Sequence, residues 1–96
     1  MQAHDFLGNA LQHMQDRATI YDAEGGERSI ERTVQLFNIL TGVEITPEEG
    51  WLFMVCLKLV RSQQGGFRAD SYEDGAAYFA LAGEAAHKRR RTEGQA

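Results

Sequence analysis

Residues 46–66 constrain the fold most, because both ends of one helix are marked within them. The segment opens on Thr46-Pro47-Glu48-Glu49, which supplies an N-cap threonine, a proline at N1 and an acid at N3, the order of a capping box. From Trp51 to Val60 the only polar side chain is that of Lys58, and the pair Gly65-Gly66 then ends the helix. A helix that is apolar on nearly all sides belongs at the centre of a bundle or at a subunit interface.

Two amphipathic helices are expected before this segment. In the first, over about residues 3–18, apolar side chains recur every three or four positions: Phe6, Leu7, Ala10, Leu11, Met14 and Ala18. The second, over about residues 27–41 and ending before Gly42, has a stripe at the same spacing: Ile30, Val34, Phe37 and one of Leu36 and Leu40. The periodicity breaks over residues 19–26, so we expect a loop there, with Tyr21 as an anchor on the core or as part of a ligand surface.

A fourth helix is expected after the glycine pair. Asp70 is placed to act as its N-cap, with Glu73 at N3. Its packing face is rich in small residues: Ala77, Tyr78, Leu81, Ala82 and Ala85. The chain is therefore predicted to be all-α, a compact bundle of about four helices with oligomerisation left open. One helical domain would span residues 1–90, and residues 91–96 would form a disordered basic and polar tail.

Charge and hydropathy narrow the class of partner. Residues 1–87 carry six Lys or Arg against thirteen Asp or Glu, and the basic residues that follow are Lys88 to Arg91. An acidic body lacks the clustered cations that neutralise phosphates, so nucleic acid is expected only through the basic tail, if at all. No long uncharged apolar run and no secretory signal is present, so we expect a cytoplasmic protein without a membrane span. The lone Cys56 is expected to be a buried hydrophobe.

Charged side chains gather around the predicted turn between the third and fourth helices. Lys58 and Arg61, three residues apart, share one face of the third helix. Asp70 and Asp74, four apart, share a face of the fourth helix with Tyr78, and antiparallel packing would bring the two faces together. The cluster is then either a salt-bridge network that satisfies a lysine in an apolar helix, or an open site. In the open site the cations would receive phosphate or carboxylate, and the acids would hold Mg²⁺.

The order of these residues resembles a family of small bacteriophage proteins of unassigned function, over about residues 16–86. The segments that carry the resemblance are spaced polar residues on helices: Asp16-Arg17 with Tyr21; Arg32, Val34 and Phe37; Gly42 to Glu49; Leu57 to Arg61; and Asp70 to Tyr78. That family is similar to phage nucleotide-modification-associated domains and, more distantly, to the MazG-type all-α nucleotide pyrophosphohydrolases. The resemblance implies a protein that acts in the cytoplasm of an infected cell.

The MazG-type enzymes bind Mg²⁺ through a Glu-Glu-x-x-Glu motif on one helix and a Glu-x-x-Asp motif on a later one. Here Glu48-Glu49 stand at a cap, and Lys58 and Arg61 occupy the following helix. Only Asp70 and Asp74 have a plausible spacing for metal ligands, so we expect no resident cofactor, with Mg²⁺ as the ion that these two acids would take.

We therefore expect a non-catalytic protein that binds a nucleotide or another small anion at the junction of the third and fourth helices. Lys58 and Arg61 would contact phosphate, Asp70 and Asp74 would orient them, and an aromatic ring would stack on a base. The ligand-binding residues expected are Arg17, Tyr21, Lys58, Arg61, Asp74 and Tyr78. One alternative is a phage protein that binds and modulates a host factor, with a purely structural charge cluster. A weaker alternative is a Mg²⁺-dependent nucleotide pyrophosphohydrolase.

Overall fold

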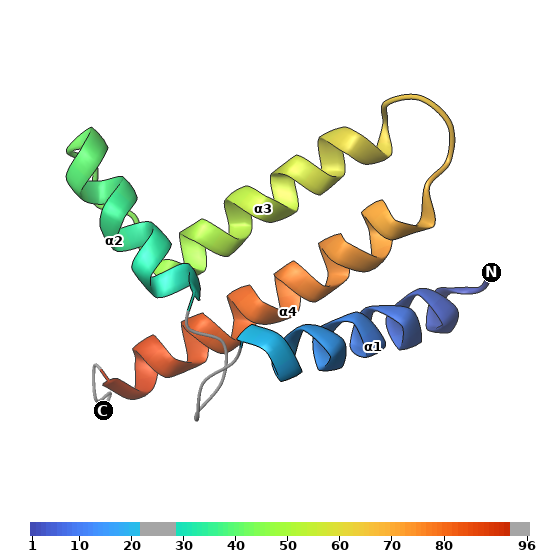
Figure 1. Cartoon of the computed structure of the whole chain (residues 1–96), viewed down its shortest axis with the longest axis horizontal. Helices are drawn as coiled ribbons and strands as arrows, with labels where there is room; N and C mark the ends of the chain where they lie inside the picture. Colours follow the sequence, from blue (N-terminus) through green and yellow to red (C-terminus); the bar gives the residue numbers. More distant parts are fainter. Residues whose placement is uncertain (22–28, 93–96) are drawn as a thin grey trace.

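The computed structural model describes residues 1–21 and 29–92, and the side chains of residues 1–20 and 29–90. This part of the chain forms four helices and no strand (Figure 1): α1 (Ala3–Tyr21), α2 (Ser29–Thr41), α3 (Pro47–Ser62) and α4 (Ala69–Thr92). The predicted all-α class and the number of helices are confirmed. None of these helices is both long and apolar enough to cross a membrane. Because α4 continues to Thr92, it passes the domain boundary predicted at residue 90, and residues 93–96 lie outside the described part.

An antiparallel hairpin of α3 and α4 holds the core. The rings of Trp51 and Tyr78 stack with their centroids 5.6 Å apart, and Leu81 and Ala82 complete the buried cluster. Small residues on the α4 face permit this close approach, as the sequence predicts. The chain reverses direction at Gly65, whose φ of +68° suits glycine.

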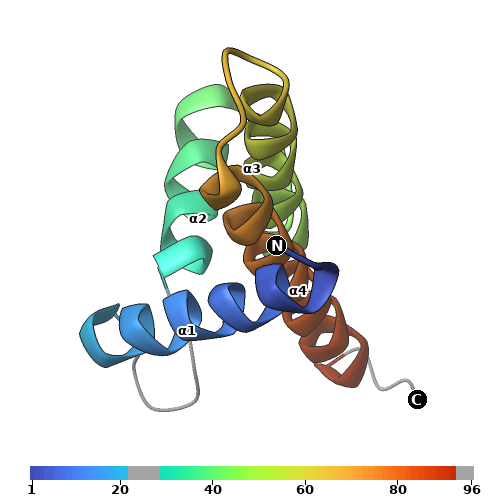
Figure 2. The same cartoon turned by 90° about the vertical axis from the view of Figure 1, so that its right-hand side faces the viewer.

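The helix α1 packs on α4, and Figure 2 shows it running across the direction of α2 and α3. Its buried side is narrow, with Ala10 buried and Met14 packed against the core cluster. An aromatic group made by Phe6, Phe67 and Tyr72 joins the start of α1 to the start of α4, with ring centroids 5.8 to 6.4 Å apart. These edge and stacked contacts position the α3–α4 turn beside α1.

The helix α2 packs against α3 through a glycine. A Cβ added at Gly50 would lie 2.7 Å from Val34 Cγ2 and 3.1 Å from Ile30 Cδ1, so only glycine permits this approach. The side chain of Asn38 fixes the connection, because its amide group donates to the Ile45 carbonyl and accepts from the Ile45 N–H. Gly42 follows α2 with a φ of +77°, which confirms its predicted place at the helix end.

The predicted capping box at the start of α3 is confirmed. The Glu49 N–H donates to Thr46 Oγ1 at 3.2 Å, and the Thr46 N–H donates to Glu49 Oε1 at 2.9 Å. Pro47 takes the first helical position, where its missing N–H costs nothing.

Several buried positions were predicted wrongly. The predicted stripe of α1 is exposed at Leu7 and Leu11, because α4 covers only the side of α1 around Ala10 and Met14. Cys56 is exposed, since it lies on the side of α3 turned away from α4. The stripe of α2 is likewise exposed at Phe37 and at both candidates for its remaining position, Leu36 and Leu40, because α3 contacts α2 around Val34 and Ile30.

The predicted loop over residues 19–26 begins later than expected. Residues 19–21 continue α1, because no glycine or proline occurs between Gly8 and Tyr21 to end the helix. The backbone of residues 22–26 and the side chain of Tyr21 lie outside the described part of the chain. The predicted role of Tyr21 as an anchor or a ligand contact therefore stays a prediction.

Candidate anion-binding site

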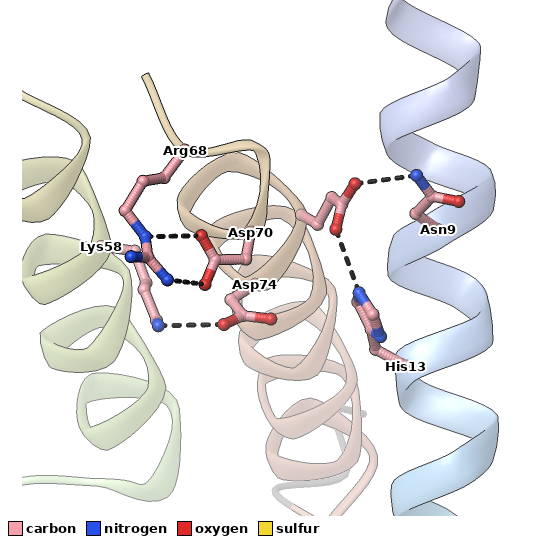
Figure 3. Close-up of polar contacts among 7 residues, drawn as sticks. Asn9, His13, Lys58, Arg68, Asp70 and Asp74 are labelled. Atoms are coloured by element: carbon pink, nitrogen blue, oxygen red, sulfur yellow. Dashed lines mark hydrogen bonds and ion pairs between the residues drawn. The ribbon is translucent and has the colours of Figure 1, made fainter. Parts of the chain in front are cut away.

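The charge cluster at the α3–α4 junction contains one closed interhelical ion pair. Lys58 Nζ lies 2.9 Å from Asp74 Oδ2, and the two side chains are 13% and 25% exposed (Figure 3). Lys58 lies on the side of α3 that faces α4, so without Asp74 its ammonium group would be largely buried and unpaired. The pairing predicted for Lys58 therefore satisfies a cation in an otherwise apolar helix.

Asp70 has a different partner from the one predicted. Its carboxylate accepts two hydrogen bonds from Arg68, from Nε at 3.2 Å and from Nη2 at 3.1 Å (Figure 3). The hydrogen bond from Arg68 lowers the pKa of Asp70, with a smaller contribution from the charge of Lys58, and it raises the pKa of Arg68. The prediction that Asp70 is the N-cap was wrong, because α4 already begins at Ala69 and the adjacent guanidinium holds the carboxylate.

Glu73 is not part of a capping box. Its side chain is buried. Its Oε2 accepts a hydrogen bond from Asn9 Nδ2 at 2.8 Å, and its Oε1 lies 3.0 Å from His13 Nε2; Asn9 and His13 are labelled in Figure 3. These contacts connect α4 to α1, and the Glu73 side chain takes no part in the α3–α4 junction. The predicted N3 role failed because a partner about sixty residues earlier in the sequence takes the carboxylate.

The mouth of the α3–α4 junction holds polar groups that have no partner among the described residues. Arg61 has no ion pair or side-chain hydrogen bond within the described part of the chain, and its side chain is exposed. Ser71 is only 5% exposed, yet its hydroxyl makes no hydrogen bond with any described residue. Both line an open groove of about 300 Å³ together with four other residues: Lys58, Gln64, Arg68 and Asp70.

The start of α4 adds positive potential to this groove. Arg68 precedes the helix, and its side chain carries only donors, so it cannot cap the first turn. The unsatisfied N–H groups at a helix start favour a nearby negative charge. The groove therefore combines the Arg61 guanidinium, which has no partner in the described part of the chain, a buried hydroxyl and a helix N-terminus whose first turn also carries Asp70. A guanidinium, a hydroxyl and a helix N-terminus are groups that bind phosphate or carboxylate oxygens. We call it the anion groove.

A second groove adjoins the anion groove and is mainly apolar. Its volume is about 270 Å³, and it shares Lys58 and Ser71 with the anion groove. The exposed aromatic rings of Tyr72 and Phe79 line it. A ligand with a charged end and a flat apolar end could therefore occupy both grooves at once.

Arg17 and Tyr78, two further predicted ligand residues, lie in a separate cleft between α1 and α4. The Tyr78 ring stacks on Trp51, and Arg17 lies over it with Cζ 5.8 Å from the centroid. Arg17 and Tyr78 line a cleft of about 100 Å³ with His13 and Asp74. The five predicted ligand residues whose side chains the structure describes are therefore not brought into one site. A base that stacked on Tyr78 would have to displace Arg17.

Each of the two acids predicted as metal ligands is paired with a basic side chain. Asp70 accepts from Arg68, and Asp74 pairs with Lys58. Among the described residues, no group of three or more His, Cys, Asp or Glu side chains could hold a metal ion. Magnesium would have to displace a cation at either carboxylate, which makes this a poor arrangement for a metal centre.

Sequence reasoning missed three residues of the anion groove. Ser71 could have been found, because it lies three residues before Asp74 and seven before Tyr78, on the same face of α4. Gln64 and Arg68 lie in the turn, where no helical period assigns a direction to a side chain. Their place in the groove follows from the path of the turn itself.

Comparison with known proteins gives one match. The model of a family described as Domain of unknown function (DUF6378) matches residues 6–86. No curated protein and no solved structure matches the chain. The matched residues extend from the first turn of α1 into the last third of α4, and so include the anion groove. Since the match covers most of its length, the chain belongs to the DUF6378 family.

Proposed function

We propose that this protein is a small non-catalytic phage accessory protein that binds a nucleotide or another small anion at the α3–α4 junction. The observation that carries the proposal is that, among the described residues, neither Arg61 nor the buried hydroxyl of Ser71 at the start of α4 has a partner. A buried polar group without a partner is unfavourable, and an anion oxygen would supply the missing acceptor. The phage setting is supported by the resemblance given above.

The groups of the anion groove have distinct roles in this proposal. Arg61 would donate two parallel hydrogen bonds to a phosphate, and Ser71 would donate one from its hydroxyl. Lys58 would add charge while remaining paired with Asp74. Asp70 would compete with the ligand for Arg68, which keeps the binding of a bare anion weak.

The adjoining apolar groove favours a nucleotide over inorganic phosphate. Tyr72 and Phe79 line that groove, and aromatic rings at its edge could stack on a base. Phe79 replaces Tyr78 in this role, since Trp51 and Arg17 already contact the Tyr78 ring and Phe6 and Phe67 already contact the Tyr72 ring. A nucleoside phosphate should therefore bind more tightly than phosphate alone.

Titrations followed by amide NMR test the proposal. Inorganic phosphate and nucleoside mono- and triphosphates are added to the wild-type protein, to Arg61→Ala, and to Arg32→Ala, which removes an exposed arginine on α2. We expect saturable shifts at the start of α4, weakened roughly tenfold to a hundredfold in Arg61→Ala and unchanged in Arg32→Ala. Absence of saturable binding by the folded wild-type protein would reject an anion-binding function.

A second candidate function is the binding of another protein. The observation that favours it is the number of large apolar side chains that are more than half exposed on α2 and α3: Leu36, Ile39, Leu40, Phe53, Leu59 and Val60. Under this reading the charges of the junction serve only the fold. It predicts no anion binding, and it predicts that a glutamate introduced at Ile39 abolishes association while the wild-type helical content is retained.

A further inference from the structure

The exposed sides of α2 and α3 form two apolar stripes. On α2, Leu36, Ile39 and Leu40 lie on the side opposite Val34, the residue that packs on α3. On α3, Phe53 and Val60 are separated by seven residues and lie opposite Trp51. Ile39 is 79% exposed and Phe53 is 71% exposed, whereas side chains of this kind are usually buried. We call the five exposed residues the α2–α3 face: Leu36, Ile39, Leu40, Phe53 and Val60.

The chain exposes more surface than a compact chain of its mass. Its accessible surface is 6941 Å², whereas a compact monomer of 10.7 kDa exposes about 5,500 Å². Its radius of gyration is 14.6 Å, against about 12.5 Å for a compact chain of 96 residues.

The core within one chain is thin for a domain of this size. No described side chain is less than 2% exposed, and much of the buried apolar set is alanine. The helix α2 projects from the hairpin and packs chiefly on α3 (Figure 1). A chain that must cover such a face in order to be stable needs a partner that is present whenever the chain is made, and a second copy meets that condition.

The charge of the α2–α3 face also suits a second copy. No Asp, Glu, Lys or Arg occurs in residues 33–43 or 50–57, although the whole chain carries a formal charge of −4. Two copies can therefore bring these stripes together without apposing like charges. A partner with a charged surface would gain no electrostatic attraction from a face that carries no charge.

We propose that the α2–α3 face is the interface of a homodimer. The interface is isologous, because the same stripes are contributed by both copies. It is separate from the anion groove, so either proposal can fail without the other. Cys56 lies on the exposed stripe of α3, three residues after Phe53, and so it becomes covered when the dimer forms.

Sedimentation equilibrium at micromolar concentrations tests this proposal. The wild-type protein is expected to have twice the 10.7 kDa chain mass, and Ile39→Glu and Phe53→Glu are expected to weaken the dimer by about a hundredfold or more. Leu7→Glu is the matched control, because Leu7 is 63% exposed on α1 and outside the face, and it should remain a dimer. Circular dichroism checks that every variant keeps its helices.

A second measurement requires no substitution. Reaction of Cys56 with a thiol reagent should be slow in concentrated wild-type protein and should accelerate when dilution dissociates the dimer. A wild-type chain that stays monomeric, or a dimer that survives both glutamate variants, would overturn the proposal. Equally fast labelling of Cys56 at every concentration would overturn it as well. The same result is expected if the face is covered only by a different protein, because the purified chain would then remain a monomer.

Discussion

The two ends of the α3–α4 hairpin differ in how their polar groups are satisfied. At the end where α3 begins, the capping box of Thr46 and Glu49 closes the helix, and Arg89 donates to Glu48 at 3.3 Å. At the end where α4 begins, Arg61 and the Ser71 hydroxyl have no partner among the described residues. The comparison suggests that one end serves the fold and that the other keeps donors available for an anion.

Between these two ends lies the pair of Lys58 and Asp74, and breaking it should have the largest effect on stability. Asp74→Ala would leave a mostly buried ammonium group unpaired, and we expect a loss of about 2 to 3 kcal/mol in the free energy of unfolding. Urea denaturation at one fixed protein concentration measures the change. Glu84→Ala, which breaks an exposed pair with Lys88, is the control and should cost much less. Equal losses in the two variants would show that the Lys58 pair behaves as a surface contact.

The closed end of the hairpin should be sensitive to its cap. Thr46→Ala removes the acceptor for the Glu49 N–H, and we expect a loss of about 1 kcal/mol in stability. Thr46→Ser keeps the hydroxyl and should lose much less. The same variants should leave phosphate binding unchanged, since the cap is at the far end of α3. If Thr46→Ser lost as much as Thr46→Ala, the capping hydrogen bond would not be the cause.

At the open end, removal of one acid should improve binding. Asp70→Asn takes away the charge that holds Arg68, so the guanidinium becomes available to an anion. We expect the affinity for phosphate to rise by about two- to fivefold, because the pair is exposed and weak. Isothermal titration of both proteins gives the comparison. A fall in affinity would mean that Asp70 orients the site instead of competing with the ligand.

The smallest expected effect is the pH dependence of the same pair. Because Arg68 lowers the pKa of Asp70 in the folded state, the ionised carboxylate stabilises the fold above its ordinary pKa of about 4. That stabilisation is lost as the pH falls through the lowered folded-state value. The melting temperature of the wild-type protein should therefore exceed that of Asp70→Asn slightly at neutral pH, and the difference should disappear in strong acid. A difference that grew on acidification would have the wrong sign for this pair.

The parts of the fold set by local chemistry could be predicted from the sequence. The cap at Thr46 and the helix end at Gly42 depend only on neighbouring residues, so the spacing of those residues was enough to predict both. The pairing of Lys58 with Asp74 was also predictable, because an apolar helix leaves a lysine few other ways to be satisfied.

The roles of the other acids on α4 could not be predicted in this way. Asp70 and Glu73 matched the pattern of an N-terminal box, but Arg68 and the α1 residues Asn9 and His13 take their carboxylates. These contacts depend on how the turn and α1 dock, and no local pattern contains that information. Tertiary contacts therefore overrode a valid local signal.

Apolar periodicity also predicted more burial than one chain provides. The periodicity located the apolar residues of α2, but Leu36 and Leu40 are exposed in the described chain. Cys56 on α3, which was also expected to be buried, is exposed as well. Periodicity shows which residues favour burial and does not show whether the covering surface belongs to the same chain. The second copy proposed above would supply that surface.

The most direct test of the two-ended account measures binding and stability together in one variant. For Arg61→Ala we expect phosphate and nucleotide binding to weaken roughly tenfold or more, while the free energy of unfolding stays within about 0.5 kcal/mol of the wild-type value. Such a result would show that Arg61 is held for a ligand and not for the fold. Wild-type binding by Arg61→Ala, or a loss of stability as large as that of Asp74→Ala, would contradict the account.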